Sequence, residues 1–555
     1  MRITIAQLSP ILGDVEGNTG RITAAIDRAV AEHADVMLTC ELSVLGYPPR
    51  DLLLRSGVIE ACERAADRIV AYTGGTGGLT VLFGHPRREP GGLRGVRNSV
   101  TVCRGGAVVA VADKQLLPGY DVFDEDRYFD PGTETCIVDI GGHPCGVVIC
   151  DDLWRAADAC AASAYAADPL AAVAASGAKT VLALNASPFV AGKWSKHHDQ
   201  LRATARDTGL TIVAVNQVGG FDDLVFDGRS LVVDGHASVR AVLPGWTEAI
   251  ETIDLADGAA VACEAPQWGA EVYRTLVSGV KDYVTRTGHG RVLLGLSGGI
   301  DSALTATIAA AAVGPENVTA VMLPSRYSSR GSRDDALALS TALGLHATPT
   351  ISIEGVHEAA RAALSVELAG GPVGLTDENI QARARGLLLM GLANATGGLL
   401  LATSNKSELA VGYSTLYGDM CGALSVIGDL FKTEVWELSR WINANADACG
   451  FSGPPIPASS IDKVPSAELR PDQSDQDALP PYEDLDAILR ERIDREASID
   501  EVNERTGLDE TLVREVCLMV DRAEFKRYQG AIVLKLGPRT FGRGRAWPLV
   551  GRSPS

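Results

Sequence analysis

The feature that most constrains the fold of this chain is a repeated alternation between short β-rich runs and stretches with helical spacing. Residues 2–8, 79–85 and 180–187 are dominated by Val, Ile, Leu and Thr and are typical of strands. Residues 18–34 carry apolar side chains at helical spacing. Repeated strand and helix units predict helices layered on β-sheets, so the first half of the chain is expected to be an α/β domain.

A second α/β unit is expected after a change of pattern near the middle of the chain. With 555 residues, the protein is too long for one ordinary hydrophobic core, so two or more domains are expected. A helix is predicted from Glu271 to about Thr287, and strands at residues 291–296 and 398–405 alternate with further helices, which is typical of a doubly wound parallel sheet. We expect a first domain in residues 1–260, a linker in 261–270 and a second domain in 271–555.

Composition and charge exclude several classes of protein. Apolar residues make up 46% and charged residues 22% of the chain, near the average for globular proteins. The formal net charge of −20 argues against a general nucleic-acid or anionic-membrane binder, but it is compatible with a local basic pocket. The apolar stretch 387–402 is interrupted by polar residues and glycines, which predicts helix, turn and strand rather than a membrane span.

The cysteines and the N-terminal segment favour the cytoplasm. There are 11 cysteines, an odd number without a CxxC pair, so neither a disulfide framework nor a zinc cluster is expected. The segment MRITIAQLSP lacks the charged and long apolar regions of a signal peptide. We therefore expect a cytoplasmic protein with small-molecule partners and without nucleic-acid or membrane partners.

The segment GLSGGIDSAL, residues 295–304, joins a predicted strand to a predicted helix. Gly298 and Gly299 permit close approach of a phosphate, and the helix start offers N–H groups and a positive dipole end. On the glycines alone, a plain structural turn is equally compatible. The lysine of a Walker P-loop is absent. Because Asp301 would repel phosphates unless a cation lay between them, the turn predicts Mg²⁺ bridging Asp301 and a pyrophosphate.

The string SGGIDS resembles the pyrophosphate loop of N-type ATP pyrophosphatases, enzymes that adenylate a carbonyl oxygen. Residues 323–336, 377–386, 400–433 and 463–482 narrow this resemblance to the NAD synthetase family. It implies a Rossmann-like domain with ATP as substrate and Mg²⁺ as cofactor. The ATP or pyrophosphate contacts that it implies are Gly295, Leu296, Ser297, Gly298, Gly299, Ile300, Asp301, Ser302 and Thr403. It also implies deamido-NAD binding by Asn379, Glu408 and Lys526, Mg²⁺ binding by Asp301 and Glu408, and phosphate binding by Lys432.

One of these stretches also has a direct physical interpretation. Thr376 and Asp377 can cap the start of a helix, and Asn379 and Arg383 would then lie i, i+4 on one of its faces. Glu408 follows the predicted strand 398–405, at the end of a sheet where α/β proteins place ligands.

A synthetase of this kind needs ammonia, which in neutral water is almost all protonated and unreactive. Release of NH₃ in a dry interior would solve this, so an amide hydrolase is expected upstream. Glu41, Lys114 and Cys150 stand at or just after predicted strands. A cysteine can attack an amide carbonyl, a carboxylate can carry the proton, and a lysine can stabilise the oxyanion. Each residue alone is weak evidence, because a cysteine that ends a buried strand is usually a core residue.

Taken in this order, the three residues resemble the Glu–Lys–Cys triad of the nitrilase superfamily. The flanking residues 46–53, 118–129, 185–193 and 216–228 resemble the glutaminase domains that are fused to NAD synthetases. The resemblance implies a nitrilase-like αββα sandwich with Glu41, Lys114 and Cys150 as catalytic residues and glutamine bound by Tyr120, Ser187 and Lys193. Asp151 and Asp223 stand where glutamate is common in relatives, and Arg330 stands where an acidic residue is often found, so their roles stay open.

The two resemblances together imply ATP-dependent amidation of deamido-NAD to NAD through an adenylate, using ammonia released from glutamine and channelled between domains. The other products are AMP, pyrophosphate and glutamate. Both domain families dimerise, which implies a homo-oligomer built on dimers, with tetramers and octamers included.

Two alternatives compete with this interpretation. The first is a nitrilase-like amidase fused to a pyrophosphatase with another substrate, such as a nucleotide base; residues 378–383 and 402–419 argue against it. The second is a nucleotide-sensing or assembly protein with silent sites, and the intact Glu41, Lys114, Cys150 and Asp301 argue against that.

Overall fold

The computed structural model describes residues 1–154, 168–256 and 260–550. The chain divides into two compact units. The first contains residues 1–221 and 225–266, and the second contains residues 222–224 and 267–555. Each unit is described by itself. In neither unit do the described residues form a helix of sufficient length and apolarity to traverse a bilayer.

The first unit contains two six-stranded sheets and a separate two-stranded hairpin. Its strands are β1 (Arg2–Gln7), β2 (Val36–Leu38), β3 (Thr80–Arg88), β4 (Val96–Arg104), β5 (Ala107–Asp113), β6 (Cys136–Ile140), β7 (His143–Ile149), β8 (Thr180–Asn185), β9 (Thr211–Asn216), β10 (Val218–Phe221), β11 (Leu224–Asp227), β12 (Leu231–Val233), β13 (Val239–Val242) and β14 (Ala249–Asp254). The first sheet has the order β14-β1-β2-β3-β4-β5, and the second has the order β13-β12-β9-β8-β7-β6.

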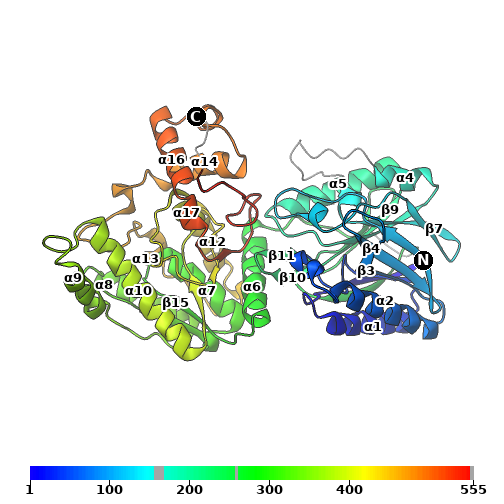
Figure 1. Ribbon diagram of the computed structural model, residues 1–555, viewed down its shortest axis with the longest axis horizontal. Helices are drawn as coiled ribbons and strands as arrows, with labels where there is room; N and C mark the ends of the chain where they lie inside the picture. The colour runs from blue at the N-terminus through cyan, green and yellow to red at the C-terminus, as the bar shows by residue number, and fades with distance from the viewer. Residues whose placement is uncertain (155–167, 257–259, 551–555) are drawn as a thin grey trace. The chain divides into compact units, whose positions relative to one another are not determined.

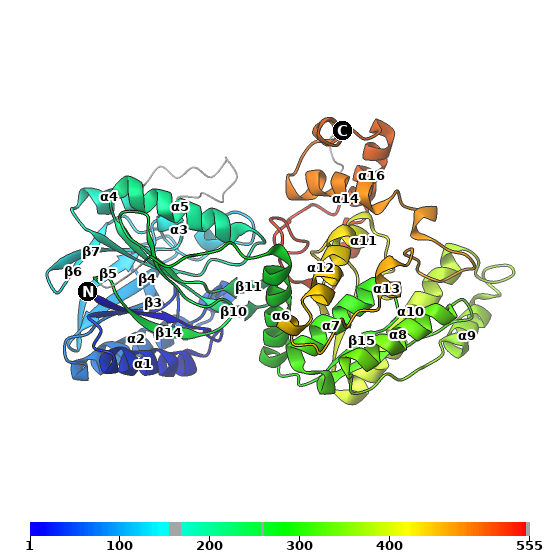
Figure 2. The ribbon, with the colours of Figure 1, turned by 180° about the vertical axis from the view of Figure 1, so that it is seen from behind.

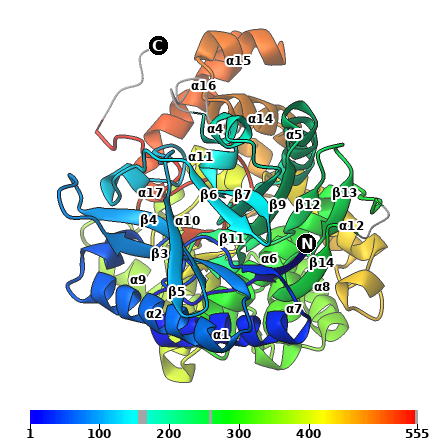
Figure 3. The same ribbon diagram turned by 90° about the vertical axis from the view of Figure 1, so that its right-hand side faces the viewer.

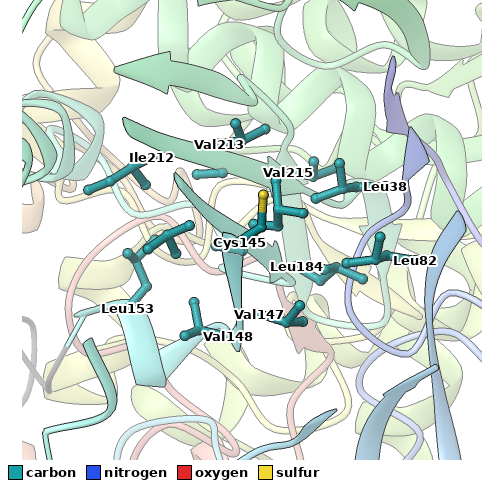
Figure 4. Packing of buried hydrophobic residues seen from close by; sticks show 14 of the residues in the cluster. Leu38, Leu82, Cys145, Val147, Val148, Leu153, Leu184, Ile212, Val213 and Val215 are labelled. Atoms are coloured by element: carbon teal, nitrogen blue, oxygen red, sulfur yellow. The ribbon is translucent and has the colours of Figure 1, made fainter. Parts of the chain in front are cut away.

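The core of this unit lies between the two sheets. Leu38 and Leu82 of the first sheet belong to the same buried cluster as Val147, Leu184 and Val215 of the second, as Figure 4 shows. The strands predicted at residues 2–8, 79–85 and 180–187 are present as β1, β3 and β8, because β-branched and aliphatic side chains fill a pleated and buried surface. Strands β5, β6, β12, β13 and β14 of the two sheets were not predicted.

Helices cover the outer faces of the two sheets, which gives the predicted αββα order of layers (Figure 1). Helices α1 and α2 lie side by side below the first sheet (Figure 3), and α4 and α5 cover the second. In α1, Ile22, Ala25, Ile26 and Ala29 are buried at helical spacing, and the Asp14 side chain caps the first turn. The helices of this unit are α1 (Val15–Ala31), α2 (Val58–Tyr72), α3 (Asp151–Trp154), α4 (Pro169–Ala175) and α5 (Lys193–Thr208).

The second unit is built on one five-stranded sheet in which every pair of strands is parallel. Its strand order is β16-β15-β17-β18-β19. The parallel arrangement agrees with the doubly wound sheet that the strand–helix alternation predicted. The strands are β15 (Val292–Gly295), β16 (Val318–Val321), β17 (Leu399–Ala402), β18 (Leu424–Ser425) and β19 (Ile532–Val533).

Helices pack on this parallel sheet and extend beyond it. They are α6 (Trp268–Arg286), α7 (Ile300–Val313), α8 (Arg330–Leu343), α9 (Glu354–Leu364), α10 (Leu375–Thr396), α11 (Lys406–Val411), α12 (Lys432–Ala444), α13 (Ala458–Asp462), α14 (Tyr482–Leu489), α15 (Ile499–Thr506), α16 (Glu510–Arg522) and α17 (Glu524–Arg527). Helix α10 contacts β15 and β17, whereas α7 contacts β15 and β16 and is covered by α6 and α12 (Figure 2). Helix α6 begins at Trp268, so its predicted start at Glu271 was wrong.

Candidate active sites

Cys150 stands at a sharp turn between a buried strand and a helix. It directly follows β7, its φ is 46°, and α3 begins at the next residue. Its backbone N–H donates to the carbonyl oxygen of Leu184 in β8 over 3.1 Å. A left-handed backbone is unusual for a residue other than glycine, and such strain gathers at functional sites. The turn places the cysteine at the carboxyl edge of the second sheet.

Glu41 is fixed from several directions although it lies just beyond the short strand β2. Its Oε2 accepts from the backbone N–H of Ala186 over 3.0 Å. Its Oε1 accepts from Lys114 Nζ over 2.8 Å and from Asn98 Nδ2 over 2.7 Å. Glu41 and Cys150 are therefore both tied to the last residues of β8 and the residue that follows, so residues far apart in sequence share one strand end.

Lys114 is a buried cation between two buried carboxylates. Its Nζ lies 2.8 Å from Glu41 Oε1 and 2.8 Å from Glu125 Oε1. Burial lowers the pKa of Lys114, whereas the negative charges of Glu125 and Glu41 raise it by a larger amount. The pKa of Lys114 therefore lies well above the usual value. Burial raises the pKa of Glu125 to about 7 against the attraction of Lys114. Tyr47 also donates to Glu125 over 2.7 Å.

The Cys150 side chain is a neutral thiol in this environment. Burial raises its pKa well above the usual value, the Glu41 charge raises it further, and the Lys114 charge opposes both. Because the thiolate is the nucleophile, the sulfur needs a base that takes its proton during attack. The triad predicted from the sequence is thus one cluster with a base and a cation, which can support acyl transfer from an amide.

The three residues predicted to bind glutamine fall into two groups. Lys193 Nζ donates to Ser187 Oγ over 2.8 Å, and both residues line a cavity of about 50 Å³. Tyr120 is not among the residues that line this cavity; its hydroxyl lies 3.2 Å from Asp151 Oδ2. Asp151 is buried, and Asp223 is buried in the turn between β10 and β11.

In the second unit, the glycine-rich turn lines a cavity of about 300 Å³. Gly298 has a φ of 86°, and a Cβ atom there would lie 2.0 Å from the Ser332 carbonyl oxygen. The Ser297 hydroxyl accepts from the Gly299 N–H over 3.1 Å, and the Ser302 hydroxyl donates to the Gly299 carbonyl over 3.0 Å. Only glycine fits at position 298. The N-terminus of α7 therefore faces the cavity that the turn lines.

Asp301 and Glu408 line the same cavity and share one lysine. Lys432 Nζ bonds to Asp301 Oδ2 and lies 3.4 Å from Glu408 Oε1. Asn405 donates to Asp301 Oδ1 over 2.9 Å and accepts from the Glu408 N–H over 2.9 Å. Burial and the negative charge of Asp301 raise the pKa of Glu408 to about 8, and Lys432 opposes this shift. The predicted carboxylate pair is present, but Lys432 pairs with it.

The pair carries too few ligands to bind a metal ion alone. No group of three or more His, Cys, Asp or Glu side chains within residues 1–154, 168–256 and 260–550 has the arrangement of a metal site. Asp475 lines the cavity too, and its charge adds to the upward shift of the Glu408 pKa. Three acidic side chains therefore face one buried lysine here, and a bound cation would favour their ionised forms.

Asn379 and Lys526 meet at a different place, along residues 412–416. Asn379 Oδ1 accepts from the Thr415 hydroxyl over 2.8 Å, and Lys526 Nζ donates to the carbonyls of Gly412 and Ser414, each over 2.8 Å. Neither Asn379 nor Lys526 lines the 300 Å³ cavity, whereas Thr403 does.

Arg383 approaches the same segment, since its Nε donates to the Leu416 carbonyl over 3.2 Å. The predicted shared face of Asn379 and Arg383 is confirmed. The predicted cap is wrong, because α10 has Gly374 at its N-cap. Asp377 instead accepts from His357 over 2.9 Å and also from Arg361, which ties α10 to α9.

Comparison with known proteins gives two adjoining matches. The carbon-nitrogen hydrolase family matches residues 2–262, and the NAD synthase family matches residues 272–530. A glutamine-dependent NAD(+) synthetase from Xylella fastidiosa is 42% identical, and the match covers 99% of this chain and 98% of the relative. The chain belongs to the family of glutamine-dependent NAD(+) synthetases.

Further members of the glutamine-dependent NAD(+) synthetase family match over the same extent. One from Xanthomonas campestris is 43% identical over 99% of this chain and 97% of its own. The solved structure of such a synthetase from Acinetobacter baumannii in complex with ADP is 36% identical, with a TM-score of 0.77 over 99% of this chain and 98% of that chain. These matches confirm the family and the two folds that the sequence motifs predicted.

Sequence reasoning missed several residues of the two sites in this synthetase. Glu125 lies eleven residues beyond Lys114, inside a flanking stretch that was recognised, and the acid in that stretch was the available signal. Asn98 and Asn405 gave no comparable signal, because their partners Glu41 and Asp301 are 57 and 104 residues away. Arg330 is an exposed residue of α8 that lies 3.6 Å from Asp334.

Proposed function

We propose that this protein is a ligase that forms NAD from deamido-NAD and ATP, with glutamine as the source of ammonia. Residues 1–260 would hydrolyse glutamine, and residues 271–555 would form the amide. The observation that carries this proposal is the presence of a buried Glu41–Lys114–Cys150 cluster and a glycine turn beside Asp301 in one chain that matches the synthetases over 99% of its length.

Glutamine hydrolysis begins at the sulfur of Cys150. Glu41 takes the thiol proton as the sulfur attacks the amide carbon, and Lys114 stabilises the negative oxygen that forms. Glu125 Oε2 and Asn98 Oδ1 have no hydrogen-bond partner among the described residues, so they can accept from the substrate amide N–H groups. Glu41 then passes the proton to the leaving nitrogen, the C–N bond of the tetrahedral intermediate breaks, and NH₃ departs to leave a thioester.

Water completes the first reaction. Glu41 activates a water molecule that attacks the thioester, and glutamate leaves while Cys150 regains its proton. Lys193 with Ser187 and Tyr120 with Asp151 would hold the charged ends of glutamine, since they offer a cation and a carboxylate, respectively.

The second reaction takes place at the glycine turn. Backbone N–H groups and hydroxyls of residues 295–302 hold the phosphates of ATP together with Thr403. The nicotinate carboxylate of deamido-NAD, held by Asn379 and Lys526, attacks the α-phosphorus, and pyrophosphate leaves. NH₃ then attacks the acyl carbon of the adenylate, AMP leaves, and the amide of NAD is formed.

Mg²⁺ fits beside Asp301 and Glu408. Magnesium is commonly bound by one or two carboxylates together with substrate phosphates, and the excess of acid over Lys432 suits it. When bound there, it supplies positive charge against the phosphate oxygens. Lys432, which pairs with both carboxylates, can turn to the departing pyrophosphate.

The ammonia is best kept away from bulk water between the two reactions. Because free NH₃ would be protonated in neutral solvent, transfer inside the protein preserves its reactivity. We propose that the protein works in the cytoplasm. We also propose that it forms a homo-oligomer built on dimers, and light scattering of the full chain tests this oligomeric state.

A coupled assay tests the proposed function. NAD and AMP are measured after incubation of the full chain with ATP, Mg²⁺, deamido-NAD and glutamine, and we expect them to form in equal amounts. The same assay with a nucleotide base in place of deamido-NAD tests the alternative, a pyrophosphatase with another substrate, which would form AMP with the base and not with deamido-NAD. Failure to form NAD from either glutamine or ammonium would refute the proposal.

A further inference from the structure

The large cavity of the second unit is lined by a partly buried cation that the proposed mechanism does not use. Its positively charged lining residues are Arg333, Arg385, Lys432 and Lys463. Lys432 and Lys463 each lie within 4.0 Å of two carboxylates. Arg333 is exposed. Around Arg385, by contrast, the part of the chain that the structure describes places no carboxylate oxygen within 4.0 Å of the guanidinium.

Arg385 lies on the face of α10 that lines the cavity, with Ala382 and Leu389 about one turn to either side. Its Nε donates to the carbonyl oxygen of Leu323 over 3.0 Å. No other acceptor of the described residues bonds to its guanidinium. Burial lowers the pKa of Arg385 to about 10, and distant acids such as Asp419 offset only part of this shift. One neutral carbonyl is thus the single direct protein partner of this charge within the described chain.

An arginine in this position needs an anion. Burial of a charge is unfavourable unless the charge is paired and hydrogen-bonded. The planar fork of donors in a guanidinium matches the two oxygens of a carboxylate or a phosphate. A cavity wall that carries such a fork without a protein carboxylate therefore has the chemistry of an anion-binding surface.

The position of Arg385 along α10 narrows the choice of anion. Asn379 and Arg383, nearer the start of the same helix, bond to residues 412–416, where deamido-NAD is proposed to bind. Arg385 lines the cavity that also contains the glycine turn for ATP. The helix thus runs from one proposed substrate contact into the cavity of the other.

We propose that Arg385 binds an anionic oxygen of the bound substrates where deamido-NAD and ATP react. This inference rests on the proposed function. Two groups share the required chemistry: the nicotinate carboxylate of deamido-NAD and a phosphate of ATP. In either case the guanidinium fork holds the negative oxygen in line for transfer, and Arg385 acts by direct contact with substrate.

The test compares full-length Arg385→Gln and Arg385→Lys with Arg330→Gln. Arg330 is the matched control, because it is an exposed arginine on α8 outside the cavity lining. With ammonium as nitrogen source, KM for ATP, KM for deamido-NAD and kcat are measured separately, together with Tm and glutamine hydrolysis. We expect Arg385→Gln to change one KM or kcat by about tenfold to hundredfold, because a charge-assisted bond is lost.

The two sources of the anion give different results. If a phosphate of ATP is bound, KM for ATP rises and exchange of pyrophosphate into ATP falls. If the nicotinate carboxylate is bound, KM for deamido-NAD rises, and the variant loses the preference for deamido-NAD over NAD in direct binding. Arg385→Lys should be intermediate, since lysine keeps the charge without the fork, and Arg330→Gln should stay within about twofold of the wild type.

Several results would overturn the inference. One is wild-type KM and kcat in a folded Arg385→Gln protein. Another is a lower Tm with both KM values unchanged, which would show that Arg385 has only a structural role through its hydrogen bond with Leu323. If Arg385→Gln does not fold, wild-type constants in Arg385→Lys would overturn it. Failure of the wild type to form NAD would instead refute the proposed function.

Discussion

The two sites of this synthetase balance their charges in opposite ways. In the first unit, the Lys114 and Glu41 side chains are fully buried and bond directly to one another, with Glu125 on the other side. In the second unit, Asp301 and Glu408 keep 19% and 17% of their side-chain surface exposed in a cavity of about 300 Å³. A small neutral amide can be handled by groups that are already paired, whereas phosphate chemistry requires space and charge that arrive with the substrates.

Loss of the sulfur should separate the two sites most completely. We expect Cys150→Ala to abolish glutamine-driven NAD formation, because the sulfur that forms the thioester is lost. Ammonium-driven synthesis should remain within about twofold, since the second site is unchanged. Initial rates with each nitrogen source measure both activities. Cys263→Ala is the matched control, and loss of both activities by folded Cys150→Ala would contradict the separation.

A methyl group in the glycine turn should break the other site. In Gly298→Ala, the new Cβ would meet the Ser332 carbonyl, and the φ of 86° would be strained. We expect ammonium-driven synthesis to fall at least about tenfold, because such strain costs about 1–3 kcal/mol and displaces the turn. Glutamine hydrolysis should persist. Gly290→Ala, which has open space around its Cβ, should have normal activity; equal rates for the two variants would refute this role of the turn.

Glu408 should also make the stability of the second unit depend on pH. The pKa of Glu408 is raised from 4.5 to about 8, so the folded state holds a proton that the unfolded state releases in this window. Stability contributed by this group is present at low pH and is lost as the pH rises toward 8. Glu408→Gln should remove this part of the decline, so between low pH and pH 8 its Tm, measured by calorimetry, should fall less than that of the wild type by at least about 2–4 °C. Identical pH profiles for wild type and variant would show that the shift is absent.

The smallest effect is expected at the exposed edge of the second unit. Arg330→Glu should change kcat, both KM values and Tm very little, because surface substitutions usually alter stability by less than about 0.5 kcal/mol. Steady-state kinetics of Arg330→Glu, measured together with Gly290→Ala as a control, tests this prediction. An activity change above about threefold would give Arg330 a role that its contact with Asp334 does not suggest.

The parts of the fold that the sequence predicted are those with strong local patterns. Strand β8 and helix α7 are rich in apolar residues, and their flanking turns contain glycine or asparagine, so the pattern is visible without knowledge of the partner. Strand β14, with the sequence AIETID, is half-exposed and lies at the edge of its sheet. Its strand character depends on pairing with β1, which is more than 200 residues earlier in the chain.

The same limit applies to the sites. Glu41, Lys114, Cys150 and Asp301 stand in distinctive motifs, so their presence could be recognised from sequence. The bond of Lys432 to Asp301 joins residues 131 positions apart, and no local pattern encodes it. The start of α10 was misplaced for a related reason: Asp377 has the chemistry of a cap, but His357 and Arg361 bind its carboxylate in the folded chain.

The bonds from Glu41 to the end of β8 have a mechanical consequence. Glu41 follows a strand of the first sheet, yet its N–H donates to the carbonyl of Asn185 at the end of β8 in the second sheet, and its Oε2 accepts from the N–H of Ala186 just beyond that strand. The rate of glutamine hydrolysis therefore depends on the alignment of the two sheets. A shift of about 1 Å between the sheets would inactivate Cys150, although circular dichroism would still detect the same strand content.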